Sequence, residues 1–354
     1  MQKSIVLIIR DGWGINPNPD HNAIANAYTP STDLLLKKYP NTILEASGTS
    51  VGLPEGYQGS SEVGHLNIGA GRIVEQEITK ITNNIQDGTF FNSPVFRKAI
   101  KNVIDNNSSL HLMGLVQDEG VHAHQDHLFA IMKHAKEQGV KQLYIHFFAD
   151  GRDSAPKSTI NYLRTLKEKI DEYGIGEIAT FMGRYYAMDR GKEWQLTTRA
   201  YNAITKGEGK KINTEENLED AIQEVYKTKT PNGKDMFDEY IPPLIIGGYE
   251  GLNDGDSVIH FNYRQDRAIQ LTMVFIEDDY PGERWKKFDI VYCGLTRYYD
   301  TFPFNILEPM DDGGGMDNLL SQILSQRGLK QIRISETQKY SHVTSFIDGK
   351  RTEP

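Results

Sequence analysis

The stretch Gly59–Gly71 reads Gly-Ser-Ser-Glu-Val-Gly-His-Leu-Asn-Ile-Gly-Ala-Gly. Its glycines permit tight turns around the hydroxyl of Ser61, and the residues that follow can form a short helix with free backbone N–H groups at its start. Most Gly/Ser-rich stretches are simply loops. Val63 stands where the Gly-x-Ser-x-Gly elbow of serine hydrolases has its second glycine. The pattern therefore favours a phosphate-binding, metal-activated serine over a histidine-activated one.

A second stretch is expected to meet this serine. Residues Ser4 to Arg10 form a continuous aliphatic run that predicts a strand buried on both faces of a parallel sheet. Asp11-Gly12 follows it directly. Chemistry in open α/β sheets gathers beyond the carboxyl ends of the strands, and an aspartate there is a hard oxygen ligand for a metal ion.

Composition excludes several classes of protein. The 354 residues are enough for two or three domains, and 25% charged with 38% hydrophobic residues is ordinary for a folded soluble chain. The net charge of −9 argues against nucleic acid or an anionic membrane as partner. Cys293 is the only cysteine, so no intrachain disulfide can form. The apolar run near the start is too short for a signal peptide, and we expect a cytoplasmic protein.

From Ser109 onward, strand-like runs alternate with amphipathic helix-like runs, which is typical of a parallel α/β sheet. Each predicted strand leads into polar or charged residues. The predicted strands are 111–116, 142–148, 178–182 and 258–261, and the predicted helices include 73–85, 157–173 and 316–326. The helix-rich stretch 194–227 is interpreted as scaffold, 300–315 as a linker and 331–334 as a further strand.

Five arginines stand at or near these strand ends: Arg152, Arg184, Arg190, Arg264 and Arg267. A single surface arginine usually does no more than keep a protein soluble. Guanidinium groups pair bidentately with phosphate and carboxylate, so five at corresponding strand ends predict a clamp for a small anion.

Several blocks of the sequence resemble the amino-terminal part of cofactor-independent (2,3-bisphosphoglycerate-independent) phosphoglycerate mutases, a family of the alkaline phosphatase superfamily. The blocks are 11–14, 44–48, 52–56 and 61–71, and further matches continue to Glu336–Thr344. The resemblance implies an α/β fold in which an alkaline-phosphatase-like domain, here incomplete (residues 1–76 and 306–354), is interrupted by an inserted α/β transferase domain (residues 77–305).

The resemblance also implies roles for individual residues. Ser61 is the covalent phosphoryl carrier, and Asp153 transfers protons and contacts substrate. Asp11 and Ser61 are metal ligands, and the family holds two manganese ions. Substrate contacts are implied for His122, Arg152, Arg184, Arg190, Arg264, Arg267 and Lys339.

Simpler interpretations remain open for three of these residues. Asp153 beside Arg152 is also consistent with a salt-bridged turn, and Lys339 with a solvated lysine. His122 and His124 are two residues apart, which is a weak signal for zinc without further ligands. His124 and His127 are interpreted as structural.

The chain also departs from the family pattern. Family members continue with a carboxy-terminal segment that carries most of the manganese ligands, whereas this chain stops at Pro354. Asp11 and Ser61 cannot supply the roughly four or more ligands that a divalent ion needs. We therefore expect a fragment with an exposed apolar face and no activity alone. Ser60, Glu119 and Gln265 are smaller departures.

The function implied by the resemblance is interconversion of 3-phosphoglycerate and 2-phosphoglycerate in glycolysis and gluconeogenesis, by a monomer whose partner is this small-molecule substrate. Two alternatives stay open. One is another metal-dependent phosphomutase or phosphatase of the superfamily. The other is a non-enzymatic phosphoglycerate-binding module or regulator without a metal centre.

Overall fold

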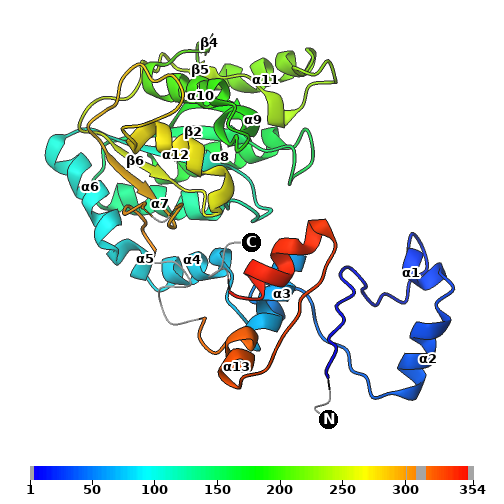
Figure 1. Cartoon of the computed structure of the whole chain (residues 1–354). Coiled ribbons are helices and arrows are strands. Elements are labelled where there is room, and N and C mark those ends of the chain that lie inside the picture. The colour runs from blue at the N-terminus through cyan, green and yellow to red at the C-terminus, as the bar shows by residue number, and fades with distance from the viewer. Residues whose placement is uncertain (1–3, 300, 308–315, 350–354) are drawn as a thin grey trace. The chain divides into compact units, whose positions relative to one another are not determined.

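The computed structural model describes residues 4–299, 301–307 and 316–349. The chain divides into two compact units, one formed by Met1–Gln76 with Gly314–Pro354 and the other by Glu77–Gly313. Figure 1 shows the elements of both units, and each unit is described by itself below.

The second unit is built on one sheet of seven strands in the order β4-β5-β3-β2-β1-β6-β7, counted over the described residues. Neighbouring strands are parallel except for the pair β3 and β5. The carboxyl ends of β1, β2, β3 and β6 therefore meet at one edge of the sheet. The strands are β1 (Ser109–Leu115), β2 (Gln142–Ala149), β3 (Glu177–Gly183), β4 (Lys210–Ile212), β5 (Leu244–Ile246), β6 (Ser257–His260) and β7 (Val291–Gly294).

Helices with one apolar face cover this sheet. In α6, Pro94 occupies the first turn and Asn107 ends the helix in the left-handed conformation. Its buried residues recur at helical spacing and pack on β1, β6 and β7. The helices of the unit are α4 (Glu77–Gln86), α5 (Thr89–Asn92), α6 (Pro94–Asn106), α7 (Gln125–Glu137), α8 (Thr159–Tyr173), α9 (Arg184–Ala187), α10 (Trp194–Lys206), α11 (Leu218–Tyr226) and α12 (Ile269–Ile276).

A row of buried polar side chains crosses the sheet. His111 Nε2 lies 3.2 Å from the carboxylate of Asp256, and His111 Nδ1 lies 3.0 Å from His146 Nε2. His146 Nδ1 in turn lies 2.9 Å from the hydroxyl of Thr180. Burial, and then neighbouring His111, lower the pKa of His146 well below its ordinary value, so this ring is neutral. Each polar group in the row has a partner, which is what burial requires.

The first unit contains helices and no strand among its described residues. α3 packs against the π-helical segment His342–Phe346 and against α13. The approach to the segment is close, because a Cβ on Gly69 would lie 2.0 Å from the carbonyl oxygen of Ile347. The helices are α1 (Ala23–Asn26), α2 (Pro30–Lys38), α3 (Ser61–Ala70) and α13 (Leu320–Gln326).

The strands predicted for the first unit at 4–10 and 331–334 are wrong. Neither segment pairs with another strand, and both are exposed: Ile5 is 93% and Ile332 87% accessible. An aliphatic run forms a doubly buried strand only when neighbours cover both its edges and both its faces. The described residues supply no such neighbours, so the runs stay extended and an apolar surface is exposed, as expected.

In the second unit the predictions agree closely with the structure. The four predicted strands are found as β1, β2, β3 and β6, and the helix predicted at 157–173 is α8. The helix predicted at 73–85 begins only at Glu77. In the first unit, the helix predicted at 316–326 begins at Leu320. β4 lies inside the stretch interpreted as helical scaffold. Much of the linker predicted at 300–315 lies outside the described residues.

Candidate active site

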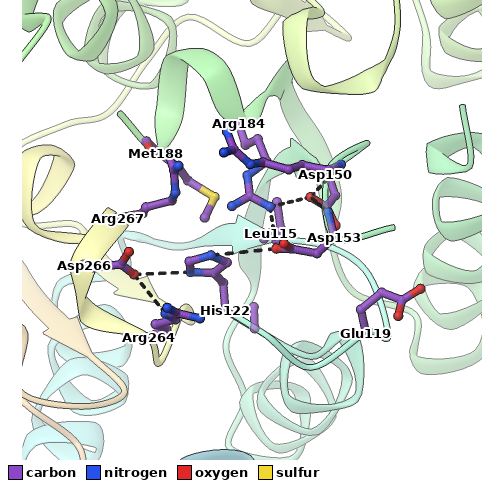
Figure 2. Close-up of polar contacts among 12 residues, drawn as sticks. Leu115, Glu119, His122, Asp150, Asp153, Arg184, Met188, Arg264, Asp266 and Arg267 are labelled. Atoms are coloured by element: carbon purple, nitrogen blue, oxygen red, sulfur yellow. Dashed lines mark hydrogen bonds and ion pairs between the residues drawn. The ribbon is translucent and has the colours of Figure 1, made fainter. Parts of the chain in front are cut away.

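Charged side chains gather where β1, β2, β3 and β6 end, as Figure 2 shows. The loop after β1 carries His122, β2 and β3 lead directly into Asp150 and Arg184, and the loop after β6 carries the remaining charged residues from Arg264 to Arg267. We call this group the arginine cluster: His122, Asp150, Asp153, Arg184, Arg190, Arg264, Asp266 and Arg267. The sequence prediction that these strand ends converge is confirmed, because parallel neighbours deliver their ends to the same edge.

Arg184 is the buried centre of the cluster and only 2% accessible. Its Nη1 lies 2.5 Å from Asp150 Oδ1 and 2.6 Å from Asp153 Oδ2 (Figure 2). Burial alone would lower the pKa of this guanidinium, but the two carboxylates more than offset that effect and raise the pKa. Arg184 Nε is buried and has no hydrogen-bond partner among the described residues. Nη1 of Arg184 is therefore held by the two carboxylates, whereas its Nε remains free to donate a hydrogen bond.

Asp150 holds the turn that carries Asp153. Its carboxylate accepts hydrogen bonds from the backbone N–H groups of Arg152 (3.3 Å), Asp153 (3.2 Å) and Ser154 (2.9 Å). Gly151 has a φ of +69°, and a Cβ there would lie 2.8 Å from Asp238 Cβ. The turn is thus fixed from both sides, and Asp153 faces the cluster.

His122 lies between two carboxylates without a hydrogen bond to either. Its Nε2 is 3.7 Å from Asp153 Oδ2 and its Nδ1 is 3.7 Å from Asp266 Oδ1 (Figure 2). These separations are too long for direct hydrogen bonds. Burial, followed by the charges of neighbouring arginines, lowers the pKa of His122 to about 2. The imidazole is therefore neutral, with one N–H to donate and one lone pair to accept.

Asp266 pairs with two further arginines of the cluster. Its Oδ2 lies 2.6 Å from Arg190 Nη1, and its Oδ1 lies 3.2 Å from Arg264 Nε. Arg267 instead donates to the carbonyl of Met188 at 3.0 Å. Burial, and then the nearby arginines, lower the pKa of Arg267. Positive charge is thus concentrated here beyond what the carboxylates neutralise, as an anion site requires.

Two further charged residues flank the cluster. Arg152 is half exposed and its Nη1 pairs with Glu239 Oε1 at 3.3 Å, so its fork is held by this partner. Glu119 is exposed beside the cluster (Figure 2). Partial desolvation of its carboxyl, and then the charges of Asp118, Asp150 and Asp153, raise its pKa.

A second set of reactive groups lies in the first unit. Ser60 caps α3, its hydroxyl accepting a hydrogen bond from the N–H of Val63 at 3.3 Å, and Ser61 is the first helical residue. Ser61 Oγ donates to the carboxylate of Asp11 and accepts from Lys339 Nζ at 2.6 Å. Lys339 also forms an ion pair with Asp11. The expected meeting of Asp11 with Ser61 is confirmed.

The Asp11 carboxylate is held in its charged form. Its hydrogen bonds with Lys339 and Ser61 lower its pKa. The ammonium group of Lys339 already contacts the Asp11 carboxylate and the Ser61 hydroxyl, so these two oxygen ligands suit a hard cation. Among the described residues, however, no group of three or more His, Cys, Asp or Glu side chains could hold a metal ion. The residues present fit part of a divalent site.

Two carboxylates of the cluster were not singled out from the sequence. Asp150 begins Asp-Gly-Arg-Asp-Ser, a pattern whose first side chain commonly accepts from the following N–H groups, and this signal was available. Asp266 stands between Arg264 and Arg267, and nothing in its local sequence indicates that it reaches Arg190, seventy-six residues earlier.

The fold and the cluster together define an α/β protein with arginine-rich charged groups at the carboxyl edge of its sheet. Residues 81–300 match the family described as the BPG-independent PGAM N-terminus. The chain belongs to the 2,3-bisphosphoglycerate-independent phosphoglycerate mutases, and the predicted fold class is confirmed with it.

Relatives and a solved structure support this assignment. The phosphoglycerate mutase of Acetivibrio thermocellus is 44% identical over 353 residues, and form 1 from Methanosarcina acetivorans is 46% identical over 354. Each match covers 98% of this chain and 67% of the relative. A crystal structure of Leishmania mexicana phosphoglycerate mutase at low cobalt concentration matches with 29% identity and a TM-score of 0.78. That match covers 97% of this chain and 64% of the other.

One further observation concerns membranes. Within the described ranges, no helix has the length and apolar character needed to cross a bilayer.

Proposed function

We propose that the intact protein interconverts 3-phosphoglycerate and 2-phosphoglycerate through a phosphoserine at Ser61. The observation that carries the proposal is the arginine cluster, in which four guanidinium groups surround a neutral histidine at one edge of the sheet. Guanidinium forks match the phosphate and carboxylate of this substrate, and the free Nε of Arg184 is one donor for them. Arg152, Arg190, Arg264 and Arg267 would contribute the remaining contacts.

Proton transfer to glycerate would fall to Asp153. Its carboxyl group is held by Arg184 at 2.6 Å and faces His122 Nε2 at 3.7 Å, a gap that leaves room for the glycerate oxygen that releases or receives the phosphoryl group. When the phosphoryl group leaves one glycerate oxygen, that oxygen needs a proton, and the other hydroxyl must lose one as it is phosphorylated. In its protonated form Asp153 would supply the first proton, and the resulting carboxylate would accept the second after glycerate has reoriented.

Ser61 would carry the phosphoryl group between these steps. The bond from Ser61 Oγ to phosphorus forms as the bond from phosphorus to the glycerate oxygen breaks, and the second half-reaction reverses this onto the other hydroxyl. Lys339, 2.6 Å from Ser61 Oγ, would balance negative charge on the transferred group. Asp11 and Ser61 would be ligands of divalent metal, for which we propose two manganese ions, and metal bound there would lower the pKa of the Ser61 hydroxyl.

The proposal has further parts that the chemistry does not decide. We propose that the reaction belongs to glycolysis and gluconeogenesis, that the protein is cytoplasmic and that it is a monomer. Because Asp11 and Ser61 supply only part of a metal site, we also propose that the 354-residue chain alone binds phosphoglycerate without turning it over.

Calorimetric titration with 3-phosphoglycerate tests the binding half of the proposal. We expect the chain to bind it and Arg264→Met to weaken binding at least tenfold. The control is Arg164→Met, because Arg164 is exposed and pairs with Glu219 outside the cluster. An absence of binding, or equal binding by the Arg264 and Arg164 variants, would refute the assignment of the cluster. A mutase assay of the full-length enzyme carrying Ser61→Ala tests the other half, and retained activity would exclude the phosphoserine.

A further inference from the structure

Two buried polar atoms of the arginine cluster face each other without a hydrogen bond. His122 Nδ1 and Asp266 Oδ1 lie 3.7 Å apart, and neither has a hydrogen-bond partner among the described residues. Arg264 Nε is 3.2 Å from the same carboxylate oxygen, but this contact lacks hydrogen-bond geometry. His122 is 4% accessible, so its Nδ1 cannot be satisfied by bulk water. Buried polar atoms without partners in an enzyme site are places where a ligand completes the hydrogen bonding.

The chemistry of the two atoms specifies what completes it. Asp266 is a carboxylate, which only accepts hydrogen bonds when ionised, and His122 is a neutral ring that has one donor nitrogen. A group lying between them must donate to the carboxylate and also accept from, or donate to, the imidazole. A hydroxyl does both, whereas a phosphate or carboxylate oxygen would be repelled by Asp266.

Asp266 is also held in place for such a contact. Its other oxygen is bound by Arg190 Nη1 at 2.6 Å, so Oδ1 is kept facing His122. The same pairing restrains Arg190, whose side chain is 55% accessible and would otherwise sample several rotamers. The Asp266 carboxylate thus fixes the guanidinium of Arg190 with one oxygen and offers the other, Oδ1, as a hydrogen-bond acceptor.

We propose that the free hydroxyl of the ligand lies between Asp266 Oδ1 and His122 Nδ1 and donates a hydrogen bond to Asp266. The site would therefore select hydroxylated phospho-acids over their deoxy analogues. This inference rests on the proposed function, since it takes phosphoglycerate as the ligand. The expected selectivity arises because a deoxy ligand leaves both buried atoms unpaired, which is the basis on which polar sites reject such analogues.

The test compares 3-phosphoglycerate with 3-(phosphonooxy)propanoate, which differs only in lacking the hydroxyl. Calorimetric dissociation constants are measured for the unaltered chain, Asp266→Ala and Asp266→Asn. We expect the unaltered chain to prefer the hydroxylated ligand about tenfold, and Asp266→Ala to reduce this preference below about threefold. Asp266→Asn retains an acceptor oxygen and is expected to give an intermediate preference; it decides the outcome if the alanine variant does not fold.

A control separates charge from contact. Asp278→Asn removes one negative charge from an exposed carboxylate paired with Lys287, and it should leave the preference unchanged. If Asp266 variants keep the full preference, or lose affinity for both ligands by the same factor, the inference is overturned. Equal binding of both ligands by the unaltered chain overturns it too, while the proposed function stands. Failure of the unaltered chain to bind 3-phosphoglycerate refutes the proposed function itself.

Discussion

Replacing Arg184 with methionine tests whether its paired guanidinium holds the cluster together. Arg184 is 2% accessible and pairs with Asp150 at 2.5 Å and Asp153 at 2.6 Å. Methionine keeps most of the apolar volume but leaves two carboxylates without their cation. Removing one partner of a buried ion pair costs about 3–5 kcal/mol. Asp150 keeps its backbone donors and the Asp153 side chain is 20% accessible, so we expect the lower end, about 3 kcal/mol.

Urea unfolding followed by circular dichroism measures this loss. The matched control is Arg164→Met, which breaks an exposed pair with Glu219 and should cost about 1 kcal/mol or less. Adding Asp153→Asn to Arg184→Met should recover part of the loss, because it removes one of the carboxylates left unpaired. If Arg184→Met costs no more than Arg164→Met, the guanidinium is not the electrostatic centre of the cluster and the reasoning fails.

Two further predictions concern the same unit. Gly183→Ala would place a Cβ 2.1 Å from the carbonyl oxygen of Glu239, so we expect a loss of about 1–3 kcal/mol in urea unfolding. The control is Gly64→Ala in α3 of the first unit, where the space is open and no loss of stability is expected. The second concerns buried His260, whose pKa burial lowers to about 3 from an ordinary 6.5. The unfolded chain therefore binds the proton first, and stability falls as pH drops from about 6.5 towards 3, by about 1.4 kcal/mol per pH unit. His260→Phe should make the decline between pH 6 and 4 shallower by that amount, and an unchanged slope in unfolding measurements would contradict this.

The second unit could be predicted from sequence because its signals are local and its partners are present. Largely apolar strands such as β2 (Gln142–Ala149) are buried along most of their length within the same unit, so the pattern and the environment agree. Chain order along a parallel sheet then places the strand ends together, which is why Arg184 and Arg264 could be assigned to one site before the structure was known.

The failures have a common physical origin. The run at residues 4–10 has the pattern of a buried strand, but a pattern states only what a segment can bury, and its exposure depends on what lies beside it. The role of Asp266 could likewise not be predicted from the sequence. Its partner Arg190 is distant in sequence, and the adjacent Arg264 and Arg267 were equally good candidates for pairing. Local sequence specifies side-chain chemistry, and tertiary geometry specifies pairing.

The row of buried polar groups across the sheet has a consequence for how this sequence can evolve. Burial acts to raise the pKa of Asp256, but its contact with His111 and the backbone N–H groups of Asn253 and Ser109 together more than offset this and lower the pKa. His111 contacts this carboxylate through Nε2 and His146 through Nδ1, and His146 contacts the Thr180 hydroxyl through its other ring nitrogen. A change at any one position removes a polar partner from a buried neighbour, so these four residues should be inherited, or replaced, as a set.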